Sequence, residues 1–146
     1  MLLSVNLPHD GFRLRYLVCE RFPLYGGDPD PLSRELSHVR FIGGGSGSGK
    51  TTIARRLAAE HGLRLYHTEP FSKYVARTTP EDAPLLHAFL AMDMDERWLN
   101  RSPTVMRDTF HAFRGETFHL VIDDLLQLPM TPAVLVEGFL ASSRRS

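Results

Sequence analysis

Apolar and polar positions along the chain follow two periods, one typical of strands and the other typical of helices. Three short runs are apolar or alternate in polarity, which predicts strands at residues 38–43, 63–67 and 133–137. Longer segments place apolar residues on one helical face, which predicts helices at residues 50–61 and 116–128. Residues 82–98 also have helical spacing, in a middle part of the chain that Pro80 and Pro84 are expected to break. This mixture of strands and helices predicts an α/β fold.

Residues that favour helix ends mark two further boundaries. Gly62 follows the first of these helices, and glycine is a common residue just past a helix C-terminus. Ser102 and Pro103 resemble an N-cap followed by proline at the first helical position. We therefore expect a further helix that runs from Pro103 to Arg114 and ends at Gly115.

The first part of the chain has a pattern of its own. Residues 12–18 partly alternate in polarity, and the turn signal at 9–11 predicts that they pair with the preceding apolar run as a β-hairpin. Residues 22–33 are rich in proline and glycine, which predicts a linker. We therefore expect an N-terminal extension over residues 1–35 and one domain over residues 36–146.

The composition bears on whether the chain binds nucleic acid or a membrane, and on the cellular compartment that we expect for it. The 17 Lys and Arg residues balance the 17 Asp and Glu residues, so net charge gives no argument for binding nucleic acid or a membrane surface. No apolar run approaches the roughly 18 residues of a transmembrane helix. Cys19 is the only cysteine, so the chain has no internal disulfide, which suits a reducing cytosol. We expect a cytoplasmic protein.

The strongest chemical signal is the run GGSGSGKT from Gly44 to Thr51, which matches the phosphate-binding loop G-x-x-x-x-G-K-[ST]. Its glycines let backbone N–H groups converge on a phosphate, and the following helix adds its positive dipole end. We expect Lys50 to reach the β- and γ-phosphates and Thr51 to bind Mg²⁺ through its hydroxyl. A flexible Gly/Ser connection is the alternative, which the flanking strand and helix disfavour. The expected nucleotide contacts are Gly44, Gly45, Ser46, Gly47, Ser48, Gly49, Lys50, Thr51 and Thr52.

Two places could supply the carboxylate that completes the metal site. Glu137 ends the third predicted strand, and a carboxylate at the end of a neighbouring strand is suited to hold Mg²⁺. Asp123 and Asp124 also follow apolar residues, but the apolar spacing continues past them and predicts the solvated face of a helix. We therefore expect Thr51 and Glu137 as metal ligands, with the two aspartates or an isolated surface glutamate as alternatives. The histidines show no metal-ligand spacing with cysteine, so we expect no other metal site.

Three segments together carry a resemblance to a known family. They are IGGGSGSGKTTIARRLA at 42–58, LRLYHTE at 63–69 and VLVEGF at 134–139. The chain resembles the P-loop small-molecule kinases, such as uridine, gluconate and shikimate kinases, over about residues 36–140. The resemblance implies a three-layer α/β fold with a parallel sheet, ATP and Mg²⁺ as cofactors, and phosphoryl transfer to a small-molecule hydroxyl. A non-catalytic nucleotide-binding protein is the alternative; a GTPase is disfavoured because no N-K-x-D motif appears.

The resemblance also indicates where an acceptor would bind. In such kinases the second strand ends near an aspartate that contacts the acceptor hydroxyl. This sequence has Glu69 near that place, so we expect Glu69 and Lys50 as catalytic residues, with a helix-start cap by Thr68 and Glu69 as the alternative. The charged segment at 92–103 could line an acceptor pocket or form a charged helix around one packed tryptophan, Trp98.

The resemblance further implies a specific strand order and a larger sheet. The third strand should lie between the first and second, and the family has two further strands and an arginine-bearing lid. We therefore expect a chain that is shortened at its C-terminus relative to the family. We also expect a bare edge on the strand at 38–43, with possible self-association there unless the N-terminal hairpin covers it.

Overall fold

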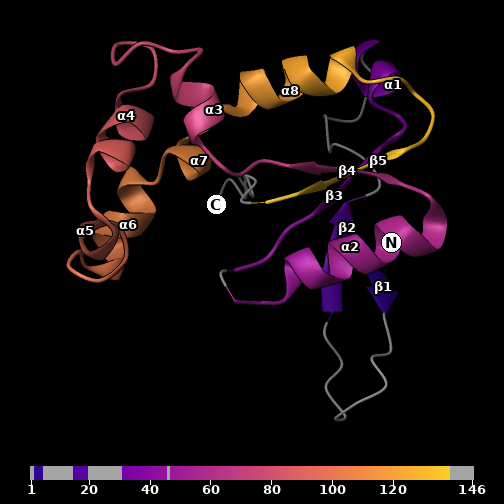
Figure 1. The fold of residues 1–146 in the computed structure, drawn as a ribbon, viewed down its shortest axis with the longest axis horizontal. Helices are drawn as coiled ribbons and strands as arrows, with labels where there is room; N and C mark the ends of the chain where they lie inside the picture. Colours follow the sequence, from indigo (N-terminus) through magenta and orange to yellow (C-terminus); the bar gives the residue numbers. More distant parts are fainter. Residues whose placement is uncertain (1, 5–14, 20–30, 46, 139–146) are drawn as a thin grey trace. The chain divides into compact units, whose positions relative to one another are not determined.

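The computed structural model describes residues 2–4, 15–19, 31–45 and 47–138 (Figure 1). They form two compact units. The first contains the described residues up to His67 together with Leu125–Gly138, and the second contains Thr68–Asp124. Among these residues, no helix is long and apolar enough to cross a bilayer.

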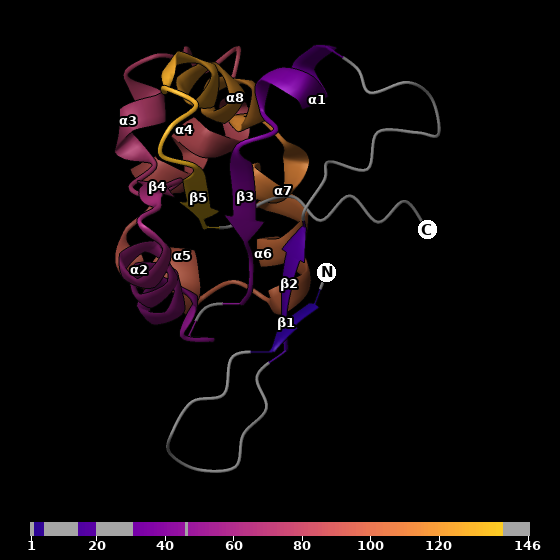
Figure 2. The same cartoon turned by 90° about the vertical axis from the view of Figure 1, so that its right-hand side faces the viewer.

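The first unit is built on a sheet with the strand order β1-β2-β3-β5-β4, and Figure 2 shows β4, β5, β3 and β2 side by side. The strands β3 (Val39–Ile42), β5 (Val134–Glu137) and β4 (Arg64–His67) are parallel. β5 is buried at every position, as a central strand of a parallel sheet should be. The three strands predicted from the sequence are confirmed, with each end within one residue. The expectation that the third predicted strand lies between the other two is also confirmed, because β5 lies between β3 and β4.

The predicted N-terminal hairpin is present as a strand pair. β1 (Leu2–Ser4) pairs antiparallel with β2 (Arg15–Cys19), whereas the turn expected at 9–11 lies outside the described residues. β2 also pairs antiparallel with β3, with Val18 opposite Ile42 and Cys19 opposite Phe41. The expectation of a bare edge on β3 is therefore wrong at these positions, because β2 supplies the backbone partner. The reason for expecting self-association through β3 therefore no longer holds at Phe41 and Ile42.

Helix α2 (Lys50–His61) covers one face of the parallel strands and has the predicted bounds. Gly62 ends it in the left-handed region at φ 61°, where its N–H donates to the Ala58 carbonyl. Ile53 and Ala54 of the helix are buried against Ile42 and Leu135 of the sheet. Burying an Ile or Leu side chain is worth about 1.5–3 kcal/mol, so this contact holds the start of α2 against the sheet. Leu57, Leu63 and Leu65 pack around the same cluster.

A short helix, α1 (Pro31–Glu35), precedes β3 in the first unit. It occupies the end of the segment that the proline and glycine content predicts as a linker, so that prediction is wrong for residues 31–33. Proline is well tolerated in a first helical turn because the N–H that it lacks has no intrahelical partner there. The rest of the predicted linker, up to residue 30, lies outside the described residues.

The second unit is helical, and its helices are shorter than predicted. Its elements are α3 (Ser72–Val75), α4 (Pro84–Ala91), α5 (Met94–Trp98), α6 (Pro103–Thr109), α7 (His111–Arg114) and the start of α8 (Phe118–Gln127). The predicted helical segment over 82–98 is divided because Met92 is extended and Asp93 starts a new helix by accepting from the Glu96 N–H. The helix predicted from Pro103 is interrupted at Phe110, where ψ is 112°. Its predicted end at Gly115 is confirmed, with φ 76°.

The helix break at Phe110 lets this residue pack into an aromatic cluster inside the second unit. Phe110 packs against Phe71 and Phe89 with ring centroids 5.9 and 5.4 Å apart, both in edge-on geometry. The neighbouring His111 is fully buried, with its ring 4.4 Å from that of Phe71. A continuous helix would turn consecutive side chains 100° apart, so the burial of two adjacent aromatic rings favours the extended backbone at Phe110.

Candidate functional site

The glycine-rich loop connects β3 to α2 in the first unit. Gly47 and Gly49 have φ angles of 74° and 81°, a region that residues with a Cβ rarely adopt. The backbone bond from Ile53 N–H to the Gly49 carbonyl begins the helix. In general, the N–H groups of a helix's first turn have no carbonyl partner within the helix, so a helix start that follows a glycine loop is suited to an anion. Ser46 lies outside the described residues.

The strand register places two polar side chains beside this loop. Ile42, Glu137 and His67 are aligned across β3, β5 and β4 as direct partners. Aligned residues of parallel strands point to the same face, and Ile42 points into the cluster beneath α2. Glu137 and His67 therefore face the side of the sheet on which α2 begins.

Glu137 contacts both of the loop residues that carry the expected chemistry. The hydroxyl of Thr51 donates to its Oε1 at 2.9 Å, and the ammonium of Lys50 lies 3.8 Å from the same oxygen. Glu137 and Lys50 are only 6% and 8% exposed. At that burial the two opposite charges offset part of each other's desolvation cost. The expected metal ligands Thr51 and Glu137 thus meet, although 86 positions separate them in the sequence.

His67 joins Lys50, Thr51 and Glu137 in one polar cluster, and the sequence pattern did not predict it as a site residue. Its Nδ1 lies 2.8 Å from Oε2 of Glu137, so the carboxylate is contacted on both oxygens. The imidazole side chain is 37% exposed. A usable signal was present in the sequence, because His67 and Glu137 each end a predicted strand of the same parallel sheet. What the pattern could not provide is the pairing register that sets them directly opposite each other.

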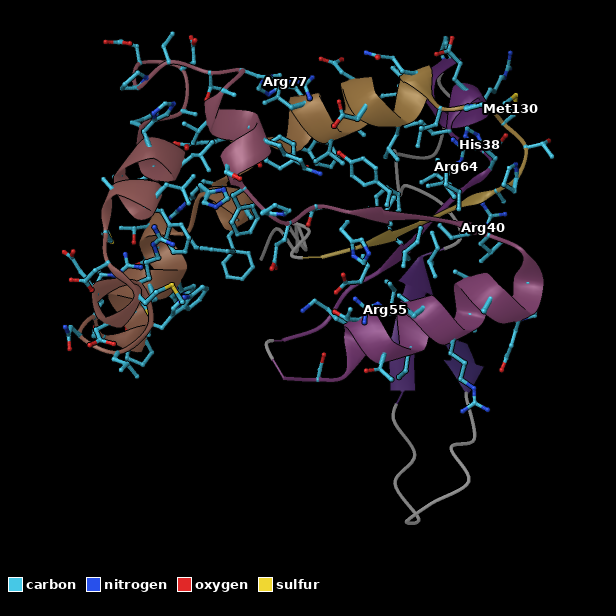
Figure 3. The ribbon with its side chains drawn as sticks, viewed as in Figure 1. His38, Arg40, Arg55, Arg64, Arg77 and Met130 are labelled. Atoms are coloured by element: carbon cyan, nitrogen blue, oxygen red, sulfur yellow. The ribbon has the colours of Figure 1, made fainter. Side chains whose placement is uncertain are left out.

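Other predicted residues take no part in this cluster. Glu69 is exposed and belongs to the second unit. The alternative in which Thr68 and Glu69 cap the next helix is wrong, because α3 starts after Phe71. Thr52 is exposed on the first turn of α2. Two arginines of the sheet that were not predicted as site residues, Arg40 and Arg64, lie near the starts of their strands, at the end of the sheet away from the loop (Figure 3).

The two aspartates considered as alternatives to Glu137 lie in helix α8, not at the end of a strand. Asp123 is exposed, as the helical spacing predicts. Asp124 accepts a hydrogen bond of 2.6 Å from Arg77, which is labelled in Figure 3. Both carboxylates belong to the second unit, so the described first unit offers Glu137 as the strand-end carboxylate beside the loop.

Several charged side chains of the segment at 92–103 form hydrogen bonds with nearby backbone groups. Asp93 caps α5, and Arg97 donates to the carbonyls of Phe89 and Leu90 at the end of α4. Arg101 donates to the carbonyls of Glu96 and Arg97. Trp98 packs edge-on against Phe89 with ring centroids 5.5 Å apart. These contacts favour the interpretation of a charged helical segment with one packed tryptophan.

The donor set beside the loop suits a hard cation. Among the described residues, no group of three or more His, Cys, Asp or Glu side chains could hold a metal ion by itself. Thr51 and Glu137 instead offer one hydroxyl and one carboxylate at hydrogen-bonding distance from each other. Mg²⁺ is usually bound in this manner, through one or two protein oxygens together with substrate phosphates and water. The residues therefore fit a magnesium ion.

Comparison with protein-family models, with curated proteins and with solved structures gave no match. Fold and geometry alone therefore define the class of the chain. It has a small three-stranded parallel α/β sheet flanked by helices, with a glycine-rich loop between β3 and α2. The lysine and threonine after that loop meet a carboxylate from the adjacent strand β5.

Proposed function

We propose that the chain is an ATP-binding protein of the P-loop type, which binds Mg·ATP at residues 44–52. The hydrogen bond between Thr51 and Glu137 carries the proposal. It joins the final residue of the phosphate-loop motif to the carboxylate at the end of the neighbouring parallel strand. This is the pair of protein oxygens that such a site needs for its metal.

The site residues have separate roles in this proposal. The loop N–H groups and the N-terminus of α2 bind the phosphates, and Lys50 neutralises the charge of the β- and γ-phosphates. Thr51 and Glu137 would hold Mg²⁺, which would supply positive charge to neutralise the phosphates. Lys50 exchanges its contact with Glu137 for the phosphates, which keeps a partner for each buried charge.

The proposed reaction is transfer of the γ-phosphoryl group to a hydroxyl of a small molecule. Support for this step comes from the sequence resemblance to small-molecule kinases. ATP consumption in the presence of nucleosides and sugars tests it, because a non-catalytic nucleotide-binding protein would bind ATP without turnover. Glu69 is the sequence-based candidate for the acceptor side, and Glu69→Gln should then reduce turnover and leave ATP binding unchanged.

Calorimetric titration of the full chain with Mg·ATP tests the binding proposal. Lys50→Ala should abolish measurable binding, because the phosphates lose their principal cation. Arg56→Ala is the matched control, since it removes a cation of the same helix whose contact is an exposed pair with Glu60. Unchanged binding by Lys50→Ala, or equal losses in both variants, would reject the assignment. Thermal melting of each variant shows whether it is folded.

A further inference from the structure

We propose that His67 is a positioning residue of this metal–nucleotide site, which holds Glu137 in the orientation that binds Mg²⁺. The inference rests on the proposed function and adds a residue that the phosphate-loop motif does not contain. His67 would act through Glu137, not by touching the nucleotide. Its effect should therefore appear in the metal dependence of binding.

The geometry assigns different partners to the two carboxylate oxygens of Glu137. Oε1 faces Thr51 and Lys50, whereas Oε2 lies 2.8 Å from Nδ1 of His67. An ionised carboxylate only accepts hydrogen bonds, so Nδ1 carries the hydrogen in this contact. The contact also joins direct cross-strand partners, because His67 and Glu137 are aligned in the register of β4 and β5. The backbone of the sheet therefore fixes the Cα of His67 directly beside that of Glu137.

A glutamate needs such a partner more than an aspartate would. Its side chain has one more rotatable bond, so its carboxylate can take more orientations, and each free rotation weakens a preorganised site. Burial adds to the requirement, because Glu137 is 6% exposed and a buried carboxylate needs hydrogen bonds to its oxygens. His67 supplies one of these bonds and leaves Oε1 directed at Thr51, where the metal is expected.

Loss of the imidazole should release Oε2 and let the Glu137 carboxylate leave the orientation in which Oε1 faces Thr51. Glu137 would then be a poorer metal ligand. Second-sphere hydrogen bonds of this kind typically contribute about 10- to 100-fold to metal affinity. Nucleotide without metal makes no use of the Glu137 carboxylate, so its affinity should not depend on His67.

The experiment compares three variants of the full chain by calorimetric titration, once with Mg·ATP and once with ATP in EDTA. His67→Phe keeps a planar ring without a nitrogen, and His67→Ala serves if the larger ring disturbs folding. Both should bind Mg·ATP about tenfold more weakly than the unmodified chain. Both should bind metal-free ATP within about twofold of it. His67→Asn places an amide donor near the position of Nδ1 and should restore most of the lost Mg·ATP affinity.

Each outcome supports or overturns the assignment. Unchanged Mg·ATP affinity in His67→Phe and His67→Ala overturns it. Equal losses with and without metal overturn it as well, because they indicate a general structural role. Failure of His67→Asn to restore affinity counts against the hydrogen bond as the cause. If the unmodified chain binds neither form of ATP, the proposed function fails, and this inference fails with it.

Discussion

Thr51 donates a hydrogen bond of 2.9 Å to Oε1 of Glu137, although the two residues are 86 positions apart. One lies on the first turn of the helix after the glycine loop, and the other ends the strand next to the strand before that loop. The contact therefore links the two parts that a phosphate-loop metal site requires. It also makes the site accessible to stability measurements that need no ligand.

The hydroxyl of Thr51 should contribute to both folding and binding. Thr51→Val keeps the shape of the side chain but leaves Oε1 of the buried Glu137 without this donor. We expect the free energy of unfolding to fall by on the order of 1 kcal/mol, together with weaker binding of Mg·ATP. Denaturant unfolding and calorimetry measure the two effects. Thr51→Ser retains a hydroxyl and should behave nearly as the unmodified chain does; equal losses in both variants would contradict the role of the hydroxyl.

The Lys50–Glu137 pair should show coupling in a double-mutant cycle. Glu137→Leu leaves the ammonium of Lys50 buried without its carboxylate, so the free energy of unfolding should fall by roughly 3 kcal/mol. Adding Lys50→Met removes the buried charge and should recover about half of that loss. Chemical denaturation of the two single variants and the double variant provides the cycle. Additive losses would mean that the two side chains do not interact in the folded chain.

Backbone conformation alone should make Gly47 costly to replace. A Cβ at Gly47 would meet no atom within 4 Å, but φ of 74° is strained for alanine. Gly47→Ala should therefore lower the free energy of unfolding by about 1–2 kcal/mol. Gly45→Ala is the matched control, because its Cβ also has open space and its φ lies outside the strained region. Similar unfolding midpoints for the two variants would show that the left-handed backbone is not required.

His111 should make the fold less stable in acid. Burial lowers the pKa of its imidazole from 6.5 to about 4. Between these two pH values the unfolded chain binds a proton here that the folded chain does not. The free energy of unfolding should therefore fall by up to roughly 3 kcal/mol as pH drops through this window. Above pH 6.5 this histidine should cause no further change.

His111→Leu removes this titration while keeping an apolar group against Phe71 and Phe89. Denaturant unfolding from pH 7 to about pH 4 should therefore show a flatter dependence for the variant. The comparison isolates His111, because all other titrating groups are common to both chains. Parallel curves would mean that the imidazole is already protonated in the folded chain or is not buried there.

Several local features were predictable because neighbouring residues determine them. The glycine loop, the helix from Lys50 to His61 and the strand that ends in Glu137 all follow from periodicity and turn chemistry within a short window. The N-terminal strand pair also followed from a local turn signal. The break at Phe110 did not, because packing against Phe71 and Phe89 overrides the helical spacing of that segment.

The candidate site also has some features that the sequence predicts and others that only the tertiary structure shows. By itself, the sequence determined the phosphate-loop motif, its helix and the strand-end carboxylate of Glu137, and the family resemblance implied the strand order. Only the tertiary structure decided that β2 pairs with β3 and that His67 stands opposite Glu137. The physical reason is that strand partners and register depend on hydrogen bonds between distant segments. A shift of one residue in that register would turn the side chains of the strand to the other face of the sheet.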